Sequence, residues 1–175
     1  DYIYELFKTN LSPNHVFHNF NHTYETVDAA KKIANGMQLS GEDLEIVMLA
    51  AWFHDSGFVE IYQGHEEKSA EFATAFLTKH KFPEEKIAQV TGCIMATKMP
   101  QRPKTILEKA ICDADLLHIA SSTFFDSTET LRQEMSMIYD RDINEETWKI
   151  DNYNFLKNHN FHTDYVNEKY VPFKE

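Results

Sequence analysis

The chain has 175 residues and a formal net charge of −11, and 42% of its residues are hydrophobic. This length and composition are typical of one globular domain with a single core and exclude a disordered chain. The negative charge disfavours nucleic-acid binding, because such binding depends on basic residues that replace counterions, and the absence of a long apolar run disfavours a membrane span.

Helical spacing of apolar residues begins at residues 23–35 and stops at Gly36, where a glycine is typical of a helix end. The stripe of this predicted helix consists of Val27, Ala30, Ile33 and Ala34. Ser40 then offers an N-cap with Asp43 three residues later, a pattern that opens a helix. That second helix continues through Phe53 and is apolar on nearly all sides, so we expect it to be central.

Five further apolar stripes follow along the chain, and Pro83 precedes the second of them as a first helical residue. Their members are Ala70, Ala73, Phe76 and Leu77; Ile87, Val90, Ile94 and Met95; Leu107, Ala110, Ile111, Ala114 and Leu117; Leu131, Met135 and Ile138; and Trp148, Asn152, Phe155 and Leu156. Residues 97–105 have the composition of a loop. We therefore expect an all-α bundle of seven or more helices in a single domain over residues 1–175, with additional C-terminal helices within 126–170.

Histidine and acidic residues gather in four segments that lie far apart in the sequence. These are "FHNFNH" at 17–22, "WFHDSG" at 52–57, "GHEEKSAEFA" at 64–73 and "ICDADLLHIA" at 111–120. Divalent metals are bound by imidazole nitrogens and carboxylate oxygens that converge from several elements. Because neighbouring residues point about 100° apart in a helix, His54 and Asp55 reach one cation most easily at a helix end, which we expect Gly57 to supply.

In this order the segments resemble the H…HD…D signature of the HD superfamily of metal-dependent phosphohydrolases, over roughly residues 15–120. The resemblance implies an all-helical core. It also implies, position by position, that the metal ligands are His22, His54, Asp55 and Asp115. Asp113 is the rival for the last position, but the Ala-Asp-x-Leu context of the family favours Asp115.

Shorter likenesses imply further roles around the metal. "HNFNH" resembles the HNxxH of cyclic-nucleotide phosphodiesterases, whose first histidine is a general acid. His18 is therefore a candidate proton donor, and Asn19 a candidate contact to substrate or a second metal. "HEEKSA" resembles a segment of small bacterial HD proteins, which implies Glu66 near the attacking water and His65 as a candidate ligand of a second metal. "ATK" resembles the same proteins and makes Lys98 a candidate phosphate contact.

The resemblance implies hydrolysis of a phosphoester or phosphoanhydride of a nucleotide or related small molecule, with Mn²⁺, Fe²⁺, Mg²⁺, Zn²⁺ or Ni²⁺ as the cofactor. Such a cation acidifies water and neutralises phosphoryl charge. Asp115 or Glu66 would take the proton of the water, and His18 would protonate the leaving oxygen. A nucleotidase, a pyrophosphatase and a phosphodiesterase all stay open. The alternative from another class is a domain that senses a nucleotide for a partner without turnover.

The remaining polar and aromatic residues have structural interpretations. We expect structural roles for five histidines, namely His15, His80, His118, His159 and His162, although His118 lies one turn beyond Asp115 and could support the ligands. Five aromatic residues are expected in the core rather than as a platform for a base: Phe124, Phe125, Trp148, Tyr153 and Phe155. Acidic residues after position 126 are expected on solvated helix faces.

The cysteines indicate a reducing environment. Cys93 and Cys112 have no metal-binding spacing and are few for a secreted scaffold. We therefore expect a cytoplasmic protein. Because the sequence begins with Asp1 rather than Met, we also expect that at least an initiator methionine has been removed.

Overall fold

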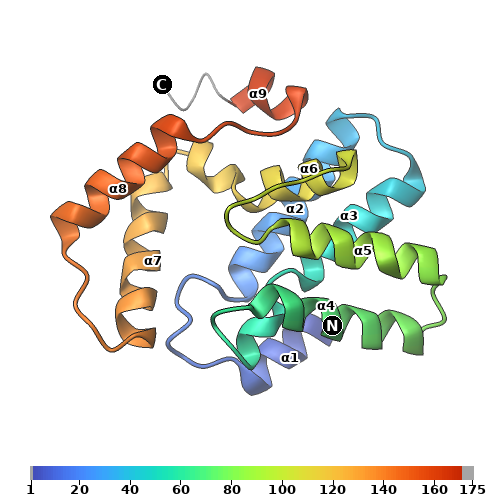
Figure 1. Cartoon of the computed structure of the whole chain (residues 1–175), viewed down its shortest axis with the longest axis horizontal. Coiled ribbons are helices and arrows are strands. Elements are labelled where there is room, and N and C mark those ends of the chain that lie inside the picture. The colour runs from blue at the N-terminus through green and yellow to red at the C-terminus, as the bar shows by residue number, and fades with distance from the viewer. Residues whose placement is uncertain (1, 171–175) are drawn as a thin grey trace.

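The computed structural model describes residues 2–170, which form helices and no strands (Figure 1). The α-helices are α1 (Tyr2–Asn10), α2 (Phe20–Gly36), α3 (Gly41–Phe53), α4 (His65–Lys79), α5 (Glu84–Ala96), α6 (Ile106–Asp115), α7 (Phe124–Ile138), α8 (Glu145–Asn158) and α9 (Asp164–Tyr170). Two short 3-10 helices are η1 (Ser56–Val59) and η2 (Leu117–Ala120). The predicted all-α fold is confirmed, and the loop expected at 97–105 joins α5 to α6. The apolar stripes did not reveal α1 or α9.

Helix α3 lies at the centre of the bundle, as its composition predicted. It packs against α2, α5 and α6, and it also contacts α4 and η1. Val47, Ala50 and Ala51 of α3 are completely buried. None of the helices in residues 2–170 is both long enough and apolar enough to cross a membrane.

Side-chain caps fix the starts of the helices that carry the polar motifs. Ser40 Oγ accepts a hydrogen bond from Asp43 N at 3.1 Å, so the predicted cap of α3 is present. Asn19 Oδ1 accepts from the backbone N–H groups of Asn21 and His22 and thereby caps α2. These bonds satisfy donors that the first turn of a helix leaves unpaired.

Gly36 is the last residue of α2, but it does not have the left-handed backbone that is typical of a glycine at a helix end. The residue with a left-handed backbone is Gln38, at φ 56°. A Cβ atom on Gly36 would lie 2.1 Å from Tyr165 Cζ of α9. Gly36 is therefore required by the close approach of the C-terminal helix.

The C-terminal helices α7 and α8 lie side by side at one edge of the bundle, away from α4 and α5 (Figure 1). Trp148 Nε1 of α8 donates to Thr128 O of α7 at 2.9 Å. The expectation that all five aromatic residues of this region are core is wrong for Phe125 and Tyr153, which are 64% and 57% exposed. Neither residue belongs to the apolar stripe of its helix, which explains why both rings remain largely exposed.

Candidate metal centre

The HD dipeptide lies just past the end of α3. His54 is the C-cap residue, and its Nδ1 donates to Ala51 O at 2.8 Å, which leaves Nε2 as the free nitrogen. Asp55 follows at φ −104° and ψ 4°, outside the helix. The expectation that Gly57 ends this helix is wrong, because Gly57 lies inside η1. A Cβ there would lie 2.1 Å from His65 O, so this glycine admits the start of α4.

Four side chains from α2, the end of α3 and α6 converge at this point. His22 Nε2 of α2 lies 3.4 Å from Asp55 Oδ2 and 3.4 Å from Asp115 Oδ1. His54 Nε2 lies 3.1 Å from Asp55 Oδ2 and 3.5 Å from Asp115 Oδ1. Asp115 is the last residue of α6. The structure thus brings together all four of the residues that the sequence motif selects.

Asp113, the rival of Asp115, performs a different task. Two residues along a helix turn the side chain by about 200°, so Asp113 faces the other side of α6. There it is fully buried and accepts hydrogen bonds from His162 N at 2.7 Å, Thr163 N at 2.9 Å and Thr163 Oγ1 at 2.6 Å. Asp113 therefore ties down the segment that leads into α9.

The converging atoms fit a divalent cation. His54 Nε2 and Asp55 Oδ2 are buried and have no hydrogen-bond partner among the described residues, and leaving such atoms unpaired is costly. His22, His54 and Asp115 each offer one ligand atom, and these atoms lie within 4.8 Å of one another. A mixed nitrogen and oxygen set of this kind suits first-row divalent metals.

The electrostatics of the cluster favour ionised carboxylates, the state that binds a cation. Burial by itself would raise the pKa of Asp55, but the His54 and His65 imidazoles hold this pKa well below its ordinary value. The pKa of Asp115 is also lowered, because the neighbouring His22 and His54 imidazoles outweigh its burial. Burial lowers the pKa of His54, yet the two carboxylates reverse the effect and raise it well above its ordinary value.

The first turn of α4 adds two of the predicted residues to the edge of the cluster. His65 Nε2 lies 3.4 Å from Asp55 Oδ1, and its ring stacks on Phe58 with 3.8 Å between centroids. His65 Nδ1 donates to Tyr62 O, which fixes the ring. Glu66 is buried beside it.

Two other predicted residues do not face the cluster. Lys98 is exposed and forms an ion pair with Glu67. The side chain of Asn19 is occupied at the start of α2, where its amide also donates to Val16 O at 2.8 Å. Capping of local backbone groups is therefore the role that the structure gives Asn19.

A carboxylate from α7 holds His18, and the sequence patterns did not point to it. Glu134 is fully buried and accepts hydrogen bonds from Phe17 N at 2.8 Å, His18 N at 2.9 Å, Tyr62 Oη at 3.1 Å and His18 Nδ1. The expectation of a solvated face is thus wrong for Glu134. A signal was present, because Glu134 stands at helical spacing between Leu131 and Ile138 in an apolar stripe.

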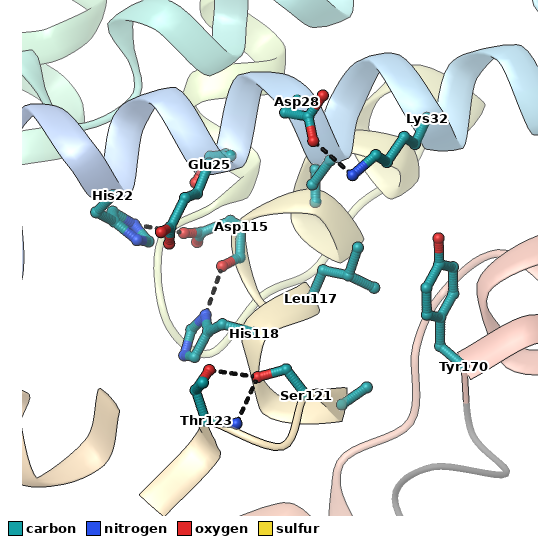
Figure 2. Close-up of a pocket in the computed structure, with 14 residues that line it drawn as sticks. His22, Glu25, Asp28, Lys32, Asp115, Leu117, His118, Ser121, Thr123 and Tyr170 are labelled. Carbon is teal, nitrogen blue, oxygen red and sulfur yellow. Dashed lines mark hydrogen bonds and ion pairs between the residues drawn. The ribbon is translucent and has the colours of Figure 1, made fainter. Parts of the chain in front are cut away.

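Two cavities adjoin the cluster, and His22, Asp115 and His118 line both. The apolar cavity has a volume of 290 Å³ and also contacts His18, Glu66 and side chains of α7 and α8. The polar cavity has a volume of 360 Å³ and lies between α2, η2 and Tyr170 (Figure 2). His118 Nδ1 donates to the backbone oxygen of Asp115 at 3.0 Å, and burial lowers the pKa of His118 to about 4. His118 is thus a neutral support for the loop that carries Asp115.

Comparison with known proteins identifies the family. The HD domain model matches residues 19–120, more than half of the chain. The chain belongs to the HD domain family. This is a family of metal-dependent hydrolases, and the matched region contains all four converging residues.

The fold is also found in a solved structure. The HD protein is similar to a predicted HD superfamily hydrolase from an uncultured Thermotogales bacterium, with a TM-score of 0.62 and 20% sequence identity. The alignment covers 89% of this chain and 86% of that chain. At this identity the likeness concerns the fold. No curated protein matches the chain by sequence.

Proposed function

We propose that this HD domain protein is a phosphohydrolase that cleaves a phosphoester or phosphoanhydride of a nucleotide or a related small molecule. The observation that carries the proposal is the convergence of His54 Nε2 and Asp55 Oδ2, both buried and without a hydrogen-bond partner among the described residues, with His22 and Asp115. Burying two imidazoles and two carboxylates in contact costs free energy, and a shared cation would offset that cost.

His22, His54, Asp55 and Asp115 hold the cation in this proposal, and His65 is the candidate ligand of a second one. A divalent cation there would lower the pKa of bound water and would neutralise charge on the phosphoryl group. The donor set accommodates Mn²⁺, Fe²⁺, Mg²⁺, Zn²⁺ or Ni²⁺.

Protein side chains move the protons. His18 is the general acid, because Glu134 binds its Nδ1 and leaves Nε2 as the nitrogen that meets the leaving oxygen. Glu66 is the better candidate for the base, since it is buried at the rim of the cluster. The lowered pKa of Asp115, which His22 and His54 maintain against its burial, makes that carboxylate a weaker base.

Replacement of Asp55 tests the proposal. Asp55→Ala removes a ligand, so bound metal measured by elemental analysis and phosphate released from a nucleotide panel should both fall. Asp126→Asn, a change at an exposed position of α7, is the control and should leave both unchanged. Unchanged metal content in both Asp55→Ala and His54→Ala contradicts the ligand assignment. Nucleotide binding without phosphate release, with every one of the five metals, would instead support the sensing domain.

A further inference from the structure

We propose that the apolar cavity binds the leaving group and that the substrate is a monophosphate ester of an uncharged planar group such as a nucleoside, not a polyphosphate. This inference rests on the proposed function and deepens it. It also concerns helices α7 and α8, which lie outside the residues that match the family.

Size and surface chemistry of the apolar cavity suit one nucleoside. Its 290 Å³ lies just below the lower limit of the range of about 300–1,000 Å³ for small-molecule sites. Away from the polar cluster, apolar side chains from several elements line this cavity, among them Met99, Ile119, Phe124, Leu131 and Phe155. Phe124 and Phe155 thus border a space in which a planar ring can stack.

The charge around this cavity opposes a polyphosphate. Among the described residues no Lys or Arg lines it, whereas Asp55, Glu66 and Asp115 do. The proposed cation would neutralise the one phosphate at the reaction centre. Additional phosphate groups in the apolar cavity would meet carboxylates at close range with no lysine or arginine to bind them.

The charge around the polar cavity also opposes a polyphosphate. Within the part of the chain that the structure describes, Lys32 is its one lysine or arginine, and Nζ of Lys32 already lies 2.5 Å from Asp28 Oδ2. Glu25 extends toward His22 and Asp115 on the same side, as Figure 2 shows. The net charge along this wall is therefore negative as well.

The position of His18 connects the apolar cavity to bond cleavage. His18 lines the cavity, so the oxygen that it protonates belongs to the group bound there. The oxygen of water forms a bond to phosphorus and gives its proton to Glu66. The ester P–O bond breaks, its electron pair stays on the leaving oxygen, and His18 supplies the proton. The products are inorganic phosphate and an alcohol, which is the free nucleoside.

Asn152 supplies a polar contact in the apolar wall. Its Nδ2 donates to Trp148 O at 2.9 Å, and its Oδ1 has no hydrogen-bond partner among the described residues. A side-chain amide pairs well with the polar edge of a base. Asn152 and Phe155 are therefore specificity residues for the leaving group.

Kinetics with the metal-loaded protein test the inference. The probes are nucleoside 5′-monophosphates, the corresponding triphosphates and β-glycerol phosphate, whose leaving group is small and not planar. We expect kcat/KM to be at least about tenfold higher for a monophosphate than for its triphosphate. Phe155→Ala should raise KM for the monophosphate by about tenfold and change KM for β-glycerol phosphate by a much smaller factor. Tyr153→Ala, an exposed ring on the same helix, is the matched control.

Binding gives a second readout that does not depend on turnover. Free nucleoside, titrated calorimetrically into the chelator-treated protein, should bind, and Phe155→Ala and the milder Phe155→Leu should weaken it. Preference for the triphosphate, equal effects of Phe155→Ala on all substrates, or no nucleoside binding would each overturn the inference. Hydrolysis of β-glycerol phosphate that is lost in Asp55→Ala supports the phosphohydrolase in any of these cases. Absence of all hydrolysis overturns the proposed function, while the calorimetry still decides what the cavity binds.

Discussion

Glu134 and His18 are separated by 116 positions in the sequence, yet the Glu134 carboxylate accepts hydrogen bonds from both the backbone N–H and the ring Nδ1 of His18. The contact joins α7 to the segment before α2. Through this contact, helix α7 fixes the position of the proposed proton donor, His18. Glu134 is thus a positioning residue for His18.

Glu134→Gln should lower kcat by about 10- to 100-fold, a part of the roughly 10²- to 10⁴-fold that general acid catalysis contributes. The loss should appear in kcat while KM stays unchanged, because His18 acts on bond cleavage and not on the first binding of the substrate. Metal content should not change. Glu129→Gln, a partly exposed carboxylate on the same helix, serves as the control for the steady-state kinetics. An unaltered kcat in Glu134→Gln argues against the positioning role.

The same variant should change how stability depends on pH. Burial by itself would raise the pKa of Glu134, but hydrogen bonds from His18 and Phe17 lower it below the ordinary value of 4.5. A carboxylate with a lowered folded-state pKa stabilises the fold above its unfolded pKa and loses that contribution as the pH falls through the folded one. Urea unfolding should show the wild type more stable than Glu134→Gln by about 1–3 kcal/mol near neutral pH. This difference should shrink below pH 4.5, and a constant difference would contradict the assignment.

Substitution of Asp113 should affect stability, and substitution of Asp115 should affect metal binding. Asp113→Ala leaves the N–H groups of His162 and Thr163 without their acceptor, so it should lower the free energy of unfolding by about 1–3 kcal/mol. Metal content of that variant should stay the same. Asp115→Ala should instead lose bound metal, which elemental analysis measures. Loss of metal from a folded Asp113→Ala variant would indicate that Asp113 is a metal ligand.

Gly57→Ala should damage the site through the backbone. The added Cβ would meet His65 O at 2.1 Å and Ser69 N at 2.9 Å, so the start of α4 must shift. We expect a loss of about 1–3 kcal/mol in urea unfolding, the usual cost of overpacking, with lower activity because His65 and Glu66 move. Gly41→Ala provides the matched control, since a Cβ added at Gly41 would have no described atom within 4 Å. Equal stability of the two variants would show that η1 and α4 can adjust.

The sequence by itself determined the helical architecture and the identity of the converging residues. Apolar spacing is a local property, so α2 to α8 could be predicted from stripes and caps such as Ser40. The HD dipeptide and its distant partners are chemically unusual enough to be recognised in order. The short helices α1 and α9 gave no clear stripe.

The tertiary structure alone decided the polar contacts that no motif indicates. The sequence context favoured Asp115 as a ligand, but only the structure shows that Asp113 lies on another face of α6 and binds the segment before α9. Glu134 is one acidic residue among many until α7 packs beside His18. Gly57 is required by a neighbouring helix rather than by its own backbone. In each case the deciding free energy comes from burial against a partner distant in the chain, and local propensity carries no information about that partner.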